Sequence, residues 1–340
     1  MLSIIVTLLI LGVMIFVHEL GHFVAAKKFG IPVSEFAIGM GPKLKSFKRG
    51  DTEYSLRTIP MGGFVDIEGI EVGSVSEHGF NSKKPYQRFI VLFAGVFMNF
   101  ITAYIVVFSL FAVNGEYLPT DKSIVGGVVE TSQAYGKFKE GDIIKSVDGV
   151  KVEKWQSMVD VVKKHDPKKP LQTIIERAGK EEIVTLSLTF NKEDKSYKIG
   201  IYPKFEKKNY NMAEAAYRSF IEFKNMTLLI FKGFKMLATR EVSVKEVKGP
   251  VGTVEIVGMF MEQGVVPVLY LAALLSINIG IFNLLPFPGL DGGRIIFVIL
   301  EKIGINVNKK IEENMHKVGI VFLLFLMALI TFNDIWNLFK

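Results

Sequence analysis

Residues 18–22 read His18-Glu19-Leu20-Gly21-His22, and they decide the fold because they lie within a long apolar segment. In an α-helix, residues four apart are separated by about 400°, which leaves both side chains on one face. His18 and His22 can therefore direct their imidazoles at one metal ion. Glu19 lies about 100° round the helix from His18, close enough to act as a general base beside that metal. The stretch predicts a metal site on a helix.

The residues before this motif are almost all apolar. Residues 2–16 read LSIIVTLLILGVMIF, and the same helix is predicted to continue to residue 26. Ionisable side chains inside a membrane-spanning helix cost about 3 kcal/mol each, so they indicate a functional site. On a helix, the pattern H-E-x-x-H is typical of zinc peptidases. A chance match is the alternative, and the second histidine at metal-binding spacing makes it the weaker one.

The composition indicates a membrane protein. The chain has 340 residues, of which 49% are hydrophobic, and its mean hydropathy is +0.34. These values suit a polytopic membrane protein that carries a soluble module. The chain has no cysteine, so a zinc site would use histidine and carboxylate ligands. The net charge of +7 is spread out with no basic run, so no nucleic-acid partner is expected.

Four apolar segments are long enough to cross a bilayer. The fold class is therefore predicted as a polytopic α-helical membrane protein with four transmembrane helices, a membrane-associated β-hairpin region and an inserted α+β domain of the PDZ type. The predicted parts are a first transmembrane helix at 1–28, a cytoplasmic-side β-hairpin or loop region at 29–87, a second transmembrane helix at 88–113, an extracytoplasmic PDZ domain at 114–206, amphipathic interfacial helices at 207–264, a third transmembrane helix at 265–294, and a cytoplasmic loop with the fourth transmembrane helix at 295–340, the last span covering 318–338.

Short strand-like pieces fill the region at 29–87, and a turn is expected at Gly50-Asp51. We expect a small hairpin or sheet beside the membrane. An exposed strand edge there could pair with the extended backbone of a substrate. A plain cytoplasmic loop is an equally good interpretation of the same residues.

The domain at 114–206 carries more charge than its flanks, and turn signals recur at Asp148-Gly149 and Ala178-Gly179. Residues 139–149 read KEGDIIKSVDG and resemble the core of bacterial, protease-associated PDZ domains. Such domains bind peptide ends or strands by adding them to a sheet edge. The resemblance therefore implies a peptide groove, which we expect near Gly126 and Gly127.

Lysine and arginine are concentrated in two connections, between the first and second spans and between the third and fourth. The positive-inside rule places both connections in the cytoplasm. The domain at 114–206 and both termini then lie outside. His18 lies about 14 Å from the cytoplasmic end of its helix, at 1.5 Å per residue.

A catalytic zinc needs three protein ligands and one open position. Asp291 is the best candidate for the third ligand, because it lies at the cytoplasmic end of its predicted span, after Pro286 and Pro288. These prolines should break the helix and turn the backbone inward. On spacing alone, a cap for a helix that begins at Gly292 is an equally good role for Asp291. Within the second span, Asn99 is expected to make an interhelical hydrogen bond.

The motif HELGH, a PDZ-like insert and the segment NLLPFPGLDGGR at 283–294 together resemble the site-2 protease family. More narrowly, the whole chain is similar to the bacterial RseP/RasP-type regulators of intramembrane proteolysis. The resemblance implies a zinc metalloprotease in a bacterial inner or plasma membrane. The residues it implies are His18, His22 and Asp291 as ligands of Zn2+, Glu19 as general base, and Asn283, Pro286, Gly62 and Gly63 at or beside the substrate.

Members of this family cleave transmembrane segments of single-span membrane proteins. Their substrates include anti-sigma factors already trimmed outside the membrane, and remnant signal peptides. This chain has room for one PDZ domain and not two in tandem, which leaves the strictness of substrate selection open. Two other functions suit the motifs, an intramembrane metal-ion transporter and a non-catalytic, membrane-anchored PDZ scaffold. No inverted repeat supports the first, and the second leaves both metal motifs without a role.

Overall fold

The computed structural model describes residues 1–340 apart from 73, 75, 192–195, 244–245, 306 and 339–340. Its contacts divide the chain into two units. One unit consists of Met1–Val113 and Met212–Lys340, and the other of Asn114–Asn211. The first unit holds the long apolar helices, and the second covers the predicted inserted domain.

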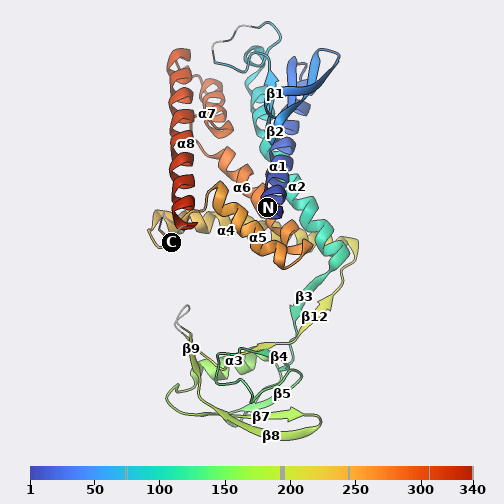
Figure 1. Ribbon diagram of the computed structural model, residues 1–340, viewed down its shortest axis with the longest axis vertical. Helices are drawn as coiled ribbons and strands as arrows, with labels where there is room; N and C mark the ends of the chain where they lie inside the picture. The colour runs from blue at the N-terminus through green and yellow to red at the C-terminus, as the bar shows by residue number, and fades with distance from the viewer. Residues whose placement is uncertain (73, 75, 192–195, 244–245, 306, 339–340) are drawn as a thin grey trace. The chain divides into compact units, whose positions relative to one another are not determined.

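Four long apolar helices build the first unit (Figure 1). They are α1 (Leu2–Lys28), α2 (Pro85–Asn114), α6 (Val265–Leu284) and α8 (Lys309–Leu338). Among the described residues, these four are long and apolar enough to cross a membrane. Helix α8 begins before residue 318, where the fourth span was predicted, because its first turns are polar and give no hydropathy signal.

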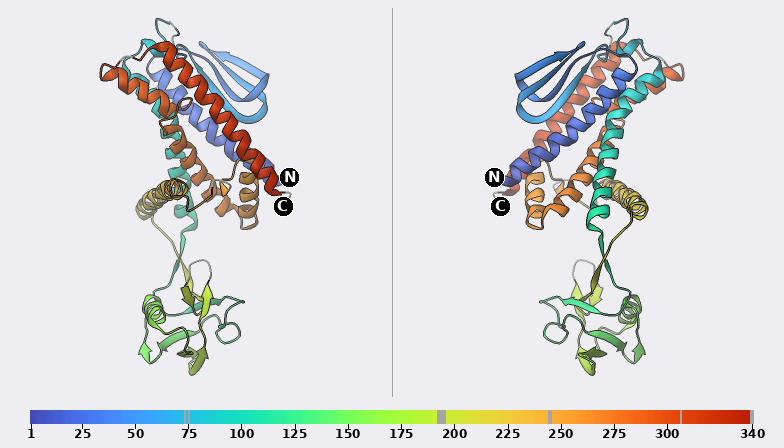
Figure 2. Two further views of the ribbon diagram at one scale, coloured as in Figure 1. Left: turned by 90° about the vertical axis from the view of Figure 1, so that its left-hand side faces the viewer. Right: turned by 90° about the vertical axis from the view of Figure 1, so that its right-hand side faces the viewer.

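Two further helices lie across the end of this unit at which both chain termini are found (Figures 1 and 2). They are α4 (Met212–Ala238) and α5 (Pro250–Glu262), and both fall within the predicted amphipathic region at 207–264. A buried apolar cluster that includes Met226, Ala103 and Ala273 packs α4 against α2 and α6. The apolar side of α4 therefore belongs to the core of the bundle.

The region predicted as the third span is divided by a turn. Helix α6 ends at Leu284, and α7 (Asp291–Lys302) begins after Pro286 and Pro288. Proline ends a helix because it has no N–H to donate and its ring clashes with the preceding turn. The turn leaves Asp291 in the first turn of α7, and the chain then continues to α8.

The strands β1 (Val33–Arg49) and β2 (Thr52–Ile67) form a hairpin that turns at residues 50–51, where the sequence predicted a turn. Both strands bend back, so that residues 35–38 pair with 53–56 and also with 63–66. The resulting order of paired segments is 43–49, 52–59, 33–40 and 63–67. The segment 63–67 is thus an edge, and no other described strand pairs with it. A location beside the membrane remains a proposal for this sheet.

The second unit is an α+β domain with its own apolar core, which includes Val125, Ile144, Leu171 and Ile175. Its main sheet has the strand order β6-β5-β7-β8. The elements of this unit are β3 (Glu116–Pro119) paired with β12 (Phe205–Lys208), β4 (Val125–Val128) paired with β11 (Ile201–Pro203), β9 (Thr189–Asn191) paired with β10 (Ser196–Lys198), and β5 (Ile143–Val147), β6 (Val150–Lys151), α3 (Trp155–Lys164), β7 (Leu171–Arg177) and β8 (Lys180–Leu186).

Both predicted turns of this domain join neighbouring strands of its sheet. Asp148-Gly149 connects β5 to β6, and Ala178-Gly179 connects β7 to β8. All four residues have positive φ, between 48° and 79°. Two-residue hairpin loops with positive φ at both positions match the right-handed twist of the flanking strands. These two signals therefore placed the hairpins correctly.

Candidate metal centre

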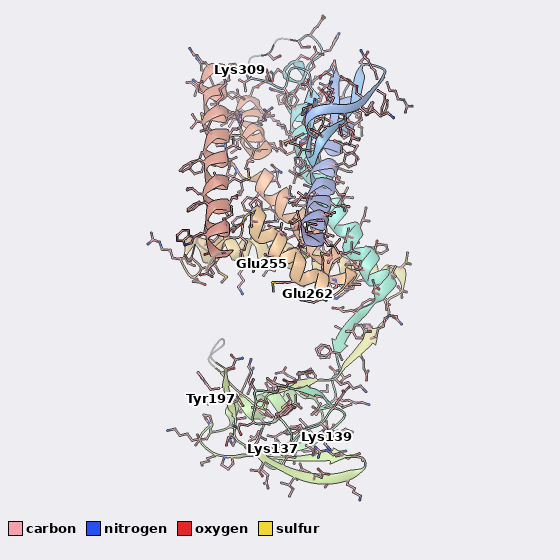
Figure 3. All side chains as sticks on the ribbon, in the orientation of Figure 1. Lys137, Lys139, Tyr197, Glu255, Glu262 and Lys309 are labelled. Carbon is pink, nitrogen blue, oxygen red and sulfur yellow. The ribbon has the colours of Figure 1, made fainter. Side chains whose placement is uncertain are left out.

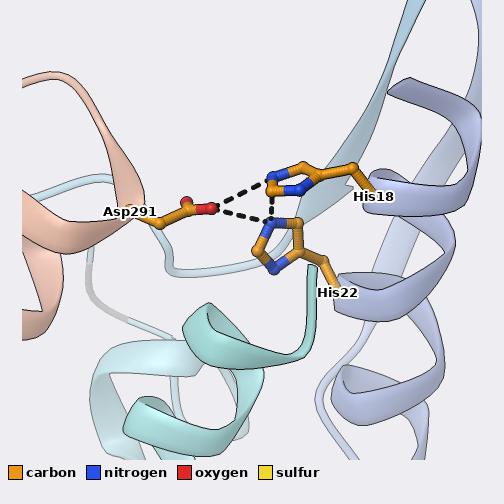
Figure 4. Close-up of side chains that lie close together, drawn as sticks. All are labelled: His18, His22 and Asp291. Atoms are coloured by element: carbon orange, nitrogen blue, oxygen red, sulfur yellow. Dashed lines mark hydrogen bonds and ion pairs between the residues drawn. The ribbon is translucent and has the colours of Figure 1, made fainter. Parts of the chain in front are cut away.

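His18, His22 and Asp291 each contribute one possible ligand atom to a cluster in the first unit, within 4.8 Å of one another (Figure 4). His18 Nε2 lies 3.0 Å from Asp291 Oδ2 and 3.1 Å from His22 Nε2. His22 Nε2 lies 3.2 Å from Asp291 Oδ2. In the part of the chain that the structure describes, this is the one group of three His, Cys, Asp or Glu side chains close enough to hold a metal ion.

These separations fit a tetrahedral zinc site. Zinc ligand atoms lie about 2.0–2.2 Å from the metal, so in a tetrahedron they lie about 3.3–3.6 Å apart. The three observed separations, 3.0, 3.1 and 3.2 Å, are only slightly shorter. Two imidazole nitrogens and one carboxylate oxygen are a common donor set of catalytic zinc, which also needs one open position. The residues therefore fit the metal that the motif predicts.

Helix α2 forms the wall behind the two imidazoles. A Cβ on Gly95 would collide with His22 Nε2 and lie 2.9 Å from His18 Cε1, so only glycine leaves room for both rings. His22 Nδ1 donates a hydrogen bond to the Val91 carbonyl at 2.8 Å. Because a carbonyl can only accept, this bond places the proton of His22 on Nδ1 and leaves Nε2 available to a metal.

Asp291 reaches the site from the first turn of α7. The preceding turn is fixed by Gly289, whose N–H donates to Nδ1 of the buried His316 on α8 at 3.0 Å. Leu290 occupies the N-cap position of α7, and no side chain caps that helix end. The carboxylate of Asp291 faces the two histidines instead, which favours the ligand role over the cap.

A cavity of about 340 Å³ opens beside the three ligand atoms. Glu19 lines this cavity, and so does Asn283 near the end of α6. The edge segment of β2 contributes Val65 and Ile67 to the same wall. The fold thus brings the predicted base, the predicted ligands and one predicted substrate-binding residue to one space beside a strand edge.

Three other predicted substrate-binding residues of the first unit do not line this cavity. Pro286 is exposed in the turn between α6 and α7. Gly62 and Gly63 are buried within β2, and a Cβ on Gly63 would lie 2.7 Å from the Ala37 carbonyl oxygen of β1. Gly63 therefore lets two strands approach closely. The substrate-binding roles of these three residues remain predictions.

The predicted groove residues Gly126 and Gly127 lie in β4, paired with β11. A Cβ on Gly127 would collide with the hydroxyl of Tyr202, so that face of the strand is covered. An apolar cavity of about 270 Å³ lies between α3 and residues 196–201, and its lining includes Met158 and Val159 but neither Gly126 nor Gly127. The groove role of the glycines remains a prediction, and this cavity is a second candidate for it.

Several contacts of the predicted ligands were not predicted from the sequence. The predicted interhelical hydrogen bond of Asn99 does form, and its partner is a predicted zinc ligand, because Asn99 Nδ2 lies 3.3 Å from His18 Nδ1. Val91, Gly95 and Asn99 recur at intervals of four, which places them on one face of α2. That spacing was the signal in the sequence that could have linked these residues to the site. The sequence contains no such signal for His316, because its partner is a backbone N–H in a turn.

Parts of the chain are similar to solved PDZ domains. The PDZ domain of an SdrC-like protein from Listeria monocytogenes is 21% identical, covers 25% of this chain and 90% of its own, and has a TM-score of 0.23. The corresponding domain from Listeria innocua is 24% identical, covers 24% of this chain and 93% of its own, and also has a TM-score of 0.23. The PDZ assignment of the second unit remains a prediction.

Similarity to known proteases runs over the whole chain. The model of peptidase family M50 matches residues 6–326. A Fusobacterium nucleatum protein whose name is that of a zinc metalloprotease is 46% identical over 100% of both chains. The regulator of sigma-W protease RasP from Bacillus subtilis is 29% identical over 99% of both chains. Because these matches leave almost no residue of the sequence outside them, the chain belongs to peptidase family M50 and is an intramembrane zinc metalloprotease of the site-2 protease type.

Proposed function

We propose that this protease cleaves within the transmembrane segments of single-span membrane proteins after another protease has trimmed them outside the membrane. Substrates of this class are anti-sigma factors and remnant signal peptides. The single observation that carries the proposal is the cavity in which Glu19 meets three zinc-compatible ligand atoms, because it lies among helices apolar enough to span a bilayer. A regulator of sigma-W as a full-length relative supports the choice of substrate class.

The residues of the cavity divide the chemistry between them. His18, His22 and Asp291 hold the zinc, which when bound acts as a Lewis acid on the scissile carbonyl. Glu19 lines the same cavity without being one of the three clustered ligands, so its carboxylate is free to accept a proton. It takes the proton of the attacking water and returns it to the leaving nitrogen. Asn283 offers an amide that can hydrogen bond to the substrate backbone.

The edge of the hairpin sheet holds the substrate extended. A transmembrane helix satisfies its own carbonyls, so a segment must unwind before it can be hydrolysed. Residues 63–67 form an edge of the sheet, and two of them, Val65 and Ile67, line the cavity. An unwound segment that pairs with this edge regains the backbone hydrogen bonds it lost, at a place beside the metal ligands.

The zinc site lies towards the cytoplasm, and the second unit lies outside. Positive residues in the connections after α1 and before α8 support this orientation. In the first unit, Lys309 lies at the end that carries the hairpin, whereas Glu255 and Glu262 lie at the opposite end (Figure 3). The second unit then meets the trimmed end of a substrate, and its apolar cavity between α3 and residues 196–201 receives a peptide end or strand.

Zinc content and cleavage, measured on one preparation, test this function. The purified full-length protein in detergent should contain about one zinc per chain and should cut a model single-span substrate within its apolar segment. The Glu19→Gln variant, prepared in parallel, should contain zinc and leave the substrate intact. Cleavage confined to the soluble parts of the substrate, or equal cleavage by the variant, would contradict the proposal.

A further inference from the structure

Asn99 joins helix α2 to the imidazole of His18. The residue is fully buried, and its Nδ2 lies 3.3 Å from His18 Nδ1. Its backbone carbonyl accepts a hydrogen bond from Ser276 Oγ of α6 at 2.8 Å, so three helices meet at this point. Its Oδ1 is buried and has no hydrogen-bond partner among the described residues. A buried amide oxygen without a donor needs a physical explanation.

The chemistry of His18 supplies a donor for that oxygen. His18 Nε2 is the atom that faces Asp291 and His22, so it must be free of a proton when it binds zinc. A neutral imidazole carries one proton, which then lies on Nδ1. The group that faces Nδ1 must be an acceptor in that state. A half-turn of the Asn99 amide exchanges Nδ2 for Oδ1 and provides one.

We propose that Asn99 is a positioning residue, whose side-chain carbonyl accepts the Nδ1–H of His18 and so fixes the tautomer and ring orientation that present Nε2 to zinc. The proposal rests on the ligand set given under Proposed function. The neighbouring ring supports it, because His22 Nδ1 donates to the Val91 carbonyl at 2.8 Å. One face of α2 thus serves both ligands, with an acceptor for each ring and Gly95 leaving space between them.

Two substitutions of similar size separate the acceptor from the volume of the side chain. Asn99→Leu keeps the bulk and removes the acceptor, whereas Asn99→Asp keeps an acceptor at the same distance. Losing an outer-shell partner of a metal-bound histidine typically costs about 10- to 100-fold in metal affinity. We expect that loss in Asn99→Leu, and near wild-type affinity in Asn99→Asp. The measurement is competition for zinc between a chelating dye and the purified full-length protein.

Ser276→Ala is the matched control, because it removes a hydrogen bond to the backbone of Asn99 and leaves the amide in place. Its zinc affinity should equal that of the wild type. Asn99→Ala provides a second variant without the acceptor if Asn99→Leu does not fold, as judged by gel filtration and thermal unfolding. In Asn99→Ala, as in Asn99→Leu, the affinity for zinc should fall by about 10- to 100-fold.

Three outcomes would overturn the proposal. Wild-type zinc affinity in a folded variant without the acceptor would show that His18 needs no partner. An equal loss in Asn99→Asp and Asn99→Leu would show that the acceptor is not what matters. A loss in Ser276→Ala as large as in Asn99→Leu would reduce Asn99 to a packing residue. His22→Ala, measured alongside, tests the ligand set itself. If His22 is not a zinc ligand, this variant should bind zinc like the wild type.

Discussion

His18 and Asp291 are 273 residues apart in the chain, and their side chains meet at 3.0 Å between Nε2 and Oδ2. One comes from the interior of α1 and the other from the first turn of α7. No local segment can bring them together, so the site exists only when these helices are packed. Zinc that binds the folded chain and not the unfolded one stabilises the fold by mass action.

Asp291→Ala tests that relationship directly. The variant leaves two histidines, which are too few for a catalytic zinc site. Loss of a residue that only hydrogen bonds to a metal ligand costs up to about 100-fold in metal affinity. Loss of a ligand should lower the zinc affinity by more than that, and the proteolytic activity should fall with it. Metal analysis after dialysis gives the readout, with Asp51→Ala in the exposed hairpin turn as the control. Full zinc occupancy with intact activity would return Asp291 to a helix-terminal role.

Glu19→Gln separates proton transfer from metal binding. The amide has nearly the same shape as the carboxylate but cannot take a proton. General-base catalysis contributes about 10²- to 10⁴-fold, so turnover of a transmembrane substrate should fall by at least about 100-fold. Zinc content and thermal stability should stay at the wild-type level. Glu262→Gln, on the exposed surface of α5, is the control for loss of a negative charge. A variant that binds zinc and still cleaves normally would remove Glu19 from the mechanism.

The sequence predicted the parts of the site that repeat within one helix. His18, Glu19 and His22 share a face of α1 by local periodicity alone, and the structure brings all three to the cavity. Asp291 needed a family resemblance, because spacing could not separate a ligand from a cap. The partner of Asn99 is 81 residues away, and that of His316 is 27 residues away. Such pairs depend on how the helices pack: the four-residue spacing on α2 marks one face of that helix but does not say which residue it meets.

The sheet shows the same limit. The turn at residues 50–51 was predictable from its residue types. The return of residues 63–66 to pair with 35–38 was not, because it depends on bulges and shifts of register along β1 and β2. That return creates the edge beside the cavity. The part of the fold nearest the proposed substrate was therefore the hardest part to predict from the sequence.

Asp334→Ala should weaken the attachment of α8. The carboxylate of this buried residue accepts hydrogen bonds from the N–H groups of Gly249 and Gly252, at 2.9 and 2.8 Å, and so caps the N-terminus of α5. Losing a cap costs about 0.5–2 kcal/mol. Thermal unfolding in detergent should show that loss, and Leu324→Ala, at an exposed position of the same helix, should not. Equal stability of the two variants would contradict the capping role.

His165 makes the second unit sensitive to pH. Its pKa is raised above the usual value because the ring donates to the Lys169 carbonyl and to the Asp148 carboxylate. A raised pKa means that protonation stabilises the fold. That stabilisation is complete below the unfolded pKa of about 6.5 and is lost as pH rises through the higher folded value. In an isolated 114–211 fragment, the wild type should therefore have a higher unfolding free energy than His165→Gln, and this difference should be largest at acidic pH. A difference in unfolding free energy that grows as the pH rises would contradict this.

The second unit should act as a gate on substrate size. A substrate with a folded domain outside the membrane should resist cleavage until that domain is removed. The structure gives a clean way to delete the gate, because Pro119 of β3 pairs with Phe205 of β12, just outside the two ends of the deletion. Removing residues 121–204 and joining the ends with a short flexible linker should close that pair as a hairpin.

The deletion variant should bind zinc like the wild type and should cleave intact as well as trimmed substrates, whereas the full enzyme should cleave only the trimmed one. Val159→Trp, which fills the apolar cavity beside α3 while the domain keeps its bulk, separates two kinds of gate. If the domain works by binding the trimmed end, this variant should cleave the trimmed substrate more slowly; if it works by bulk, it should behave like the wild type. Loss of all cleavage on deletion would make the domain a structural support, and equal cleavage of both substrates by the full enzyme would mean that it serves another partner.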